Sequence, residues 1–175
     1  MYWKPFRLNG KDFDLSHLHP RSMFFTQAVK GDNPERVYEV SVIFSMHCFT
    51  EFPIGTRLDP SFAYSDNRET RHFNLRRYEL SFHLPRIIED LMQCRCFHTG
   101  RDNFFTFKLI DENGAQVDYE IFFSVTKSER GALNLYVQSA YVRDYLHSNR
   151  PHEKPIRFAV ILFNTLNNRP IKVPT

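Results

Sequence analysis

Apolar and polar residues alternate with a period of two over several long stretches of this 175-residue chain. Between Val37 and Phe49 the even-numbered residues are apolar or carry a thiol, whereas the odd-numbered residues include glutamate, serine and histidine. Such alternation places successive side chains on opposite faces of a β-strand. The pattern predicts a strand with one buried face, paired as a hairpin with residues 23–29 across the turn Lys30-Gly-Asp-Asn-Pro34.

The second half of the chain repeats this alternation three times. Residues 104–111, 117–126 and 133–142 predict an antiparallel meander, with the hairpin signal Glu112-Asn-Gly114 after the first strand. In the third stretch, strand parity places Tyr141 on the same face as the apolar residues Leu133, Leu135 and Val137. The apolar run at 156–163 predicts one further strand.

One segment has helical spacing instead. Ile87, Ile88, Leu91 and Met92 recur on one side of a helix that begins near Pro85 and ends near Cys94. Residues 1–20 predict irregular structure, and residues 51–70 predict a long loop. The expected fold is a single α+β domain over 1–175, with a twisted, mostly antiparallel sheet of about six strands and one principal helix packed on one face.

The amino-acid composition excludes some classes of protein. Hydrophobic residues make up 42% of the chain and charged residues 25%, which predicts a folded domain. Only 6 glycines are present, and neither the dinucleotide nor the P-loop glycine motif occurs. A net charge of +3 permits an anionic partner without requiring one. Three cysteines, no signal peptide and no long apolar span predict a cytoplasmic protein with no membrane partner.

The strongest local concentration of charge is the segment Arg68–Tyr78. We call it the arginine cluster, and its basic side chains are Arg68, Arg71, His72, Arg76 and Arg77. Guanidinium groups bind phosphate bidentately and can stabilise the charge that develops on it during a reaction. Acidic residues interrupt the run, so a solvated, salt-bridged connector before the helix is the alternative interpretation.

His47 is the second candidate. Counted along the predicted strand, it shares the open face with Glu39, Ser41 and Ser45, where an imidazole can act as a general acid or base. The alternative is a hydrogen-bonded histidine at the end of a strand. Tyr141, followed by Arg143, either belongs to the core with its hydroxyl at the rim or lies beside a cleft at the strand end.

Two further groupings suggest metal or acid–base chemistry less strongly. Cys94, Cys96 and His98 offer three possible zinc ligands, but their spacing departs from the usual pattern and buried thiols are the preferred interpretation. His17 and His19 lie two residues apart and offer a general acid or a metal ligand, or else are ordinary loop residues. We expect a protein with no metal and no cofactor.

A helix followed by an antiparallel meander that ends in Ser139-Ala-Tyr141 resembles the barnase/RelE-type toxin ribonucleases over about residues 81–143. The resemblance implies metal-independent cleavage of RNA by attack of the ribose 2′-hydroxyl. It implies that His47 transfers the proton, that Arg71 and Arg77 hold the phosphate, and that Tyr141 stacks on a base or donates a proton. Arg68, His72 and Arg76 would bind further phosphate oxygens, and an antitoxin would be a protein partner.

A different class of function fits the same sequence. A Phe-rich sheet domain with a mildly basic surface can be a non-enzymatic accessory protein of a phage or mobile element that binds and blocks a protein or nucleic acid. In that case exposed phenylalanines form an apolar patch and the 51–70 loop is a docking element. A module that binds RNA without cutting it would use the same arginines. The ribonuclease hypothesis requires His47 and at least two arginines to converge on one concave surface.

Overall fold

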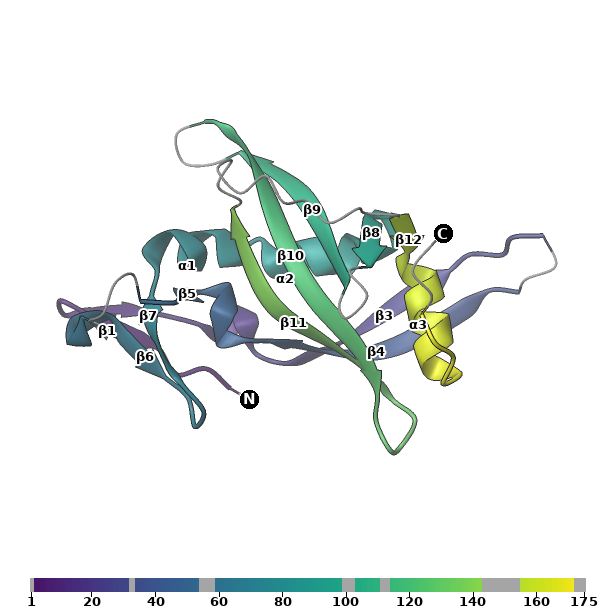
Figure 1. The fold of residues 1–175 in the computed structure, drawn as a ribbon, viewed down its shortest axis with the longest axis horizontal. Coiled ribbons are helices and arrows are strands. Elements are labelled where there is room, and N and C mark those ends of the chain that lie inside the picture. Colours follow the sequence, from purple (N-terminus) through teal and green to yellow (C-terminus); the bar gives the residue numbers. More distant parts are fainter. Residues whose placement is uncertain are drawn as a thin grey trace.

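The computed structural model describes residues 2–31, 34–53, 59–98, 103–110, 114–142 and 155–171. Its largest element is a seven-stranded sheet in the order β12-β8-β9-β10-β11-β4-β3 (Figure 1). Neighbouring strands are antiparallel except for the parallel pair β11–β4. The predicted α+β class and mostly antiparallel sheet are confirmed, although the described residues place seven strands in this sheet. The strands are β3 (Arg21–Gln27), β4 (Arg36–Phe44), β8 (Arg95–His98), β9 (Asn103–Ile110), β10 (Gln116–Lys127), β11 (Leu133–Val142) and β12 (Pro155–Arg157).

The predicted hairpin is present, with β3 and β4 in antiparallel register. The even-numbered residues of β4 from Tyr38 to Phe44 are buried, as the alternation indicated. The strand ends at Phe44, however, because the Ser45 hydroxyl accepts the backbone N–H of His47 at 3.0 Å and starts the 3-10 turn η2 (Met46–Cys48). His47 therefore belongs to a turn, and the assignment of its face by strand parity was wrong.

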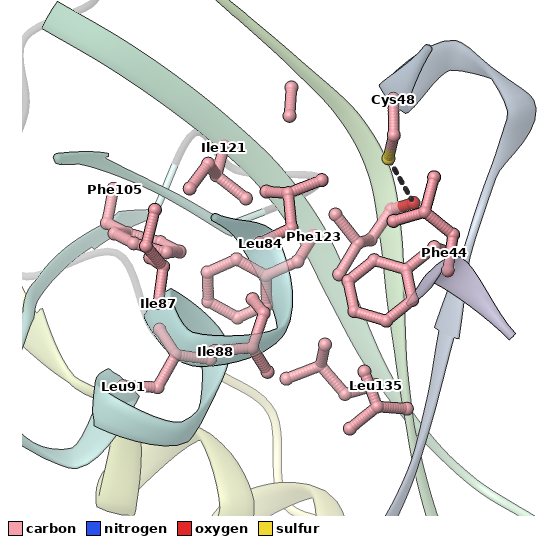
Figure 2. Packing of buried hydrophobic residues seen from close by; sticks show 14 of the residues in the cluster. Phe44, Cys48, Leu84, Ile87, Ile88, Leu91, Phe105, Ile121, Phe123 and Leu135 are labelled. Atoms are coloured by element: carbon pink, nitrogen blue, oxygen red, sulfur yellow. Dashed lines mark hydrogen bonds between the residues drawn. The ribbon is translucent and has the colours of Figure 1, made fainter. Parts of the chain in front are cut away.

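The predicted helix forms α2 (Leu84–Glu89) and continues as the 3-10 turn η4 (Asp90–Gln93). Its side chains Leu84, Ile87, Ile88 and Leu91 pack against the buried face of the sheet, as Figure 2 shows. Each such side chain contributes about 1.5–3 kcal/mol by leaving water. The helix thus packs opposite the apolar rows of β4, β9, β10 and β11 in the hydrophobic core.

Two further helices were not predicted. The helix α1 (Leu75–Ser81) begins within the arginine cluster and is capped by the Asn74 side chain. The apolar run expected to be a strand forms β12 for three residues and then α3 (Phe158–Leu166). Phe158, Ile161 and Leu162 are buried at helical spacing, so the strand prediction was wrong. A short run of consecutive apolar residues fits either structure, and tertiary packing selected the helix.

Two small antiparallel sheets occupy the end of the molecule opposite α3 (Figure 1). They are formed by β1 (Phe6–Leu8) with β2 (Lys11–Phe13), and by β5 (Thr50–Glu51), β7 (Thr70–Phe73) and β6 (Ala63–Ser65). The 3-10 turns η1 (Ser16–Leu18) and η3 (Pro60–Phe62) lie between these strands in the chain. The described parts of 2–20 and 51–70 therefore contain more regular structure than expected. Stacking of Phe6 on Phe73, with ring centroids 4.1 Å apart, joins the two small sheets. The centre of the predicted loop, 54–58, lies outside the described residues, as do residues 112–113 of the predicted hairpin turn.

A β-bulge changes the face on which Tyr141 lies. The register of β10 with β11 shifts between Phe122 and Phe123, so that Gln138 is the extra residue. Beyond this shift Ala140 is buried, whereas Tyr141 lies opposite Glu120 and stacks on Phe122 with centroids 5.7 Å apart. The prediction that Tyr141 shares the face of Leu133, Leu135 and Val137 was wrong, because one inserted residue reverses the alternation.

Candidate functional site

A carboxylate joins His47 to the arginine cluster. The Nε2 atom of His47 lies 2.6 Å from Oε1 of Glu69, and Nη1 of Arg71 donates to Oε2 of the same carboxylate at 3.4 Å. Arg71 is also fixed by its Nε donating to the hydroxyl of Thr50 at 3.1 Å. We call His47, Glu69 and Arg71 the His–Glu–Arg set. It brings a candidate base, a candidate acid and a cation within contact of one another.

The local fold explains how these side chains meet. The η2 turn presents His47, and Glu69 precedes β7, which carries Arg71. Asp66 accepts the backbone N–H groups of Arg68 and Glu69 at 2.8 and 2.9 Å and so fixes the turn that leads into β7. Pairing of β7 with β5 then places Arg71 beside Thr50. The contact between His47 and Glu69 spans 22 residues of the sequence.

The hydrogen bond from His47 is the main cause of the lowered pKa of Glu69; burial opposes it, and the charges of His47 and Arg71 add to the lowering. Glu69 is therefore ionised at neutral pH. The carboxylate also offsets the positive charge of its neighbours. A substrate phosphate would have to compete with Glu69 for Arg71, whose side chain is only 11% exposed.

Arg77 is held mainly by backbone. Its Nη1 donates to the carbonyl oxygens of His47 at 3.2 Å and Thr50 at 2.7 Å, linking α1 to η2 and β5. Burial lowers the pKa of its guanidinium, and nearby Glu51 opposes that shift. The guanidinium carbon lies 5.3 Å from the ring centroid of Tyr141, which is a cation–π distance. The main role of Arg77 in this arrangement is therefore to fix the turn that carries His47.

The predicted residues line two separate hollows. His47 and Arg68 line one of about 260 Å³, together with Asp66, Glu69 and Tyr136. Arg76, Arg77 and Tyr141 line another of about 160 Å³, together with Glu51 and Asn74. His72 lines neither of these two hollows. Its ring stacks on Phe62 with centroids 4.8 Å apart, and its Nδ1 lies 3.9 Å from Glu51.

The remaining candidates lie elsewhere. Cys96 and His98 are buried in β8, and burial raises the pKa of the Cys96 thiol to about 12. Within the described ranges, no group of three or more His, Cys, Asp or Glu side chains is arranged to hold a metal ion. Arg143 lies outside the described residues.

His17 and His19 both make contacts that hold segments of the fold together. His17 Nε2 lies 2.7 Å from the hydroxyl of buried Ser81, and its ring stacks on Phe82 with centroids 3.9 Å apart. Burial lowers the pKa of His17 to about 4. His19 Nε2 lies 3.0 Å from the carbonyl oxygen of Trp3. Because Ser81 is fully buried, its hydroxyl has no access to a substrate.

Sequence reasoning missed Glu69, which was treated only as an interruption of positive charge. A carboxylate within an arginine run is usually a solvated charge, so its type and position gave no signal. Only the pairing of β5, β6 and β7 places it against His47.

The fold and the site define an α+β protein with a polar hollow in which histidine, glutamate and arginine meet. A protein-family model, that of the YjaZ family, matches residues 5–166, and the chain belongs to this family. No curated protein and no solved structure matches the chain. Across the residues that the structure describes, no helix combines the length and the apolar character needed to cross a membrane.

Proposed function

We propose that this protein is a metal-independent endoribonuclease that acts at the hollow lined by His47, Glu69 and Arg68. The observation that carries the proposal is the 2.6 Å contact between His47 Nε2 and Glu69 Oε1 on the wall of that hollow. A carboxylate and an imidazole in contact can act as a base and an acid in one reaction. Arg68 lines the same hollow, and Arg71, which pairs with Glu69 outside that lining, adds positive charge beside it.

In the proposed reaction Glu69 removes the proton from a ribose 2′-hydroxyl, and the 2′-oxygen forms a bond to the adjacent phosphorus. The bond from phosphorus to the 5′-oxygen of the next nucleotide breaks, and His47 donates a proton to that oxygen. The products are a 2′,3′-cyclic phosphate and a free 5′-hydroxyl. Arg71 and Arg68 stabilise the extra negative charge on the phosphoryl oxygens during this step.

The second hollow extends the proposed substrate path. Tyr141 offers a ring on which a base can stack, a contact worth about 1–3 kcal/mol per base. Arg76 is the exposed arginine at that hollow and would bind a neighbouring phosphate. Arg77 acts through the carbonyl of His47 and is a positioning residue in this scheme.

A gel assay on total RNA, with a chelator present, tests the proposal. The wild type should cut RNA, and both His47→Ala and Glu69→Gln should lower the rate at least a hundredfold, within the range that general acid–base groups contribute. His83→Ala is the matched control, because His83 is exposed beside α2 and lies outside both hollows. Its rate should equal that of the wild type.

Absence of RNA cleavage by the folded wild type would contradict the proposal. Equal cleavage by the wild type and His47→Ala would remove His47 from the mechanism. End analysis adds an independent check, since a 3′-hydroxyl product in place of a cyclic phosphate would exclude attack by the 2′-oxygen.

The alternative, a non-enzymatic protein that binds and blocks a partner, is favoured by a different surface. Phe24 is 68% exposed on β3 and Val37 is 59% exposed on β4. Within the described part of the chain β3 pairs with β4 alone, so its outer edge can accept a further strand. If the wild type cuts no RNA, Phe24→Ser should abolish partner binding while His47→Ala leaves it intact.

A further inference from the structure

A larger hollow lies at the other end of the molecule, beside α3. It has a volume of about 710 Å³ and is bounded by the end of β3, the start of β4, η4 and the first turns of α3. We call it the basic groove. Four of its lining side chains are cationic, and none of the described lining residues is acidic. The cations are Lys30, Arg36, Arg157 and Arg169, and the apolar walls include Val29, Met92, Val160 and Phe163.

Two of the arginines are held on one aromatic ring. The guanidinium carbon of Arg36 lies 4.5 Å from the ring centroid of Phe163, and that of Arg169 lies 5.3 Å from it. The two guanidinium groups therefore lie within about 10 Å of each other on a common support. Among the described residues no carboxylate pairs with Arg36, Arg157 or Arg169. Like charges held together without a counter-charge favour binding of an anion.

The start of α3 also favours binding of an anion in the basic groove. Arg157 is its N-cap residue and makes no side-chain capping hydrogen bond. Ala159 and Val160 occupy the second and third helical positions, whose N–H groups a capping side chain would normally satisfy, and both residues line the groove. An anion in the groove can accept these N–H groups and interact with the positive end of the helix dipole.

The size and walls of the groove restrict the anion. Pockets for small organic molecules occupy about 300–1,000 Å³ and are largely apolar with a few polar groups. Arginine forks match phosphate oxygens bidentately. We infer that the basic groove binds a small organic polyphosphate of nucleotide size, with its phosphates on Arg36, Arg157, Arg169 and the start of α3. Its organic part lies against Met92 and Val160.

Calorimetric titration with ATP, inorganic tripolyphosphate and adenosine, in magnesium-free buffer at near-physiological salt, tests this inference. ATP should bind at least threefold more tightly than tripolyphosphate and at least a hundredfold more tightly than adenosine. The double variant Arg157→Gln with Arg169→Gln should weaken ATP binding at least tenfold. Both residues are exposed, so this variant should fold.

The control variant Lys4→Gln with Lys11→Gln removes the same amount of charge near β1 and β2, at the other end of the molecule (Figure 1). It should change ATP affinity less than twofold. A second groove variant, Val160→Glu, places a carboxylate among the cations at a residue that is 42% exposed, and it should also weaken binding at least tenfold.

Lack of ATP binding, or equal binding by the wild type and both groove variants, would overturn the inference. Tripolyphosphate binding as tightly as ATP would exclude a role for the apolar walls. His47→Ala should bind ATP like the wild type, so this result is independent of the ribonuclease proposal.

Discussion

The molecule has two concentrations of arginine, and they differ in what surrounds them. In the arginine cluster, Arg71 pairs with a carboxylate and Arg77 with two backbone carbonyls. In the basic groove, Arg36 and Arg169 contact an aromatic ring, and the described lining contains no acid. The cluster that is dense in the sequence is largely neutralised in space. In the groove, Arg36, Arg157 and Arg169 come from distant parts of the chain and pair with no carboxylate among the described residues.

This difference separates two uses of arginine. A guanidinium that donates to carbonyls or to a carboxylate holds segments of the fold together, and part of its hydrogen-bonding capacity is used before any ligand arrives. A guanidinium on an aromatic ring is oriented but not neutralised, so it remains available to an anion. Density of basic residues in a sequence is therefore a weaker indication of an anion site than the absence of acidic neighbours in the structure.

Removing Arg77 should give the largest effect on stability. Arg77→Met leaves two carbonyls without their donor and detaches η2 from α1, so we expect the free energy of unfolding to fall by about 2–4 kcal/mol. Urea denaturation followed by circular dichroism measures this change. Arg68→Ala, at a side chain that is 68% exposed, is the control and should change the value by less than about 0.5 kcal/mol. Equal effects of the two variants would contradict a bracing role.

His17 extends the comparison to the imidazoles, because it is half-buried and its Nδ1 has no hydrogen-bond partner among the described residues, whereas His47 contacts Glu69. Its pKa is about 4 in the folded protein and 6.5 as its ordinary value. The unfolded chain therefore binds more protons between these values, and stability is complete above pH 6.5 and falls as the pH drops towards 4. Allowing for partial exposure, the loss attributable to His17 is about 1–2 kcal/mol.

Denaturation at a series of pH values measures that loss. His17→Gln should show a flatter dependence of stability on pH between 6.5 and 4, whereas His83→Ala should keep the slope of the wild type. An unchanged slope in His17→Gln would show that other groups cause the acid sensitivity.

Substituting the groove arginines should raise the stability of the protein, whereas substituting Arg77 should lower it. In the ligand-free protein Arg157→Gln with Arg169→Gln relieves like-charge repulsion, so we expect stability to rise by about 0.5–1 kcal/mol at low ionic strength. The gain should disappear at about 1 M salt, where the Debye length is about 3 Å. Thermal unfolding at both salt concentrations measures it. A loss of stability at low salt would mean that these side chains are structural.

Substitution of Glu69 is expected to have the smallest effect on stability. Both members of the His47–Glu69 pair are partly exposed, at 36% and 42%, so Glu69→Gln should lower stability by only about 0.5 kcal/mol. Chemical denaturation at pH 7 provides the measurement. A much larger loss would mean that Glu69 fixes the fold, and a loss of RNA cleavage in this variant would then need rescue by Glu69→Asp to count as chemical.

Part of the fold could be predicted because the responsible interactions are local or periodic. The alternation in β4, β10 and β11 and the helical spacing of Ile87, Ile88 and Leu91 each indicate which face is buried. Prediction failed where a single residue changes the period. Ser45 ends β4 by accepting the N–H of His47, and the bulge at Gln138 moves Tyr141 to the other face. The helix α3 was missed because consecutive apolar residues fit both periods.

By itself the sequence determined the α+β class, the strands of the meander and the main helix, because hydrophobic periodicity encodes which side chains leave water. Only the tertiary structure decided which charges meet. It brought Glu69 to His47 across 22 residues and collected Lys30, Arg36, Arg157 and Arg169 into one groove. The physical reason is that burial follows the local pattern of the chain, whereas electrostatic environment depends on distances between segments that the pattern does not specify.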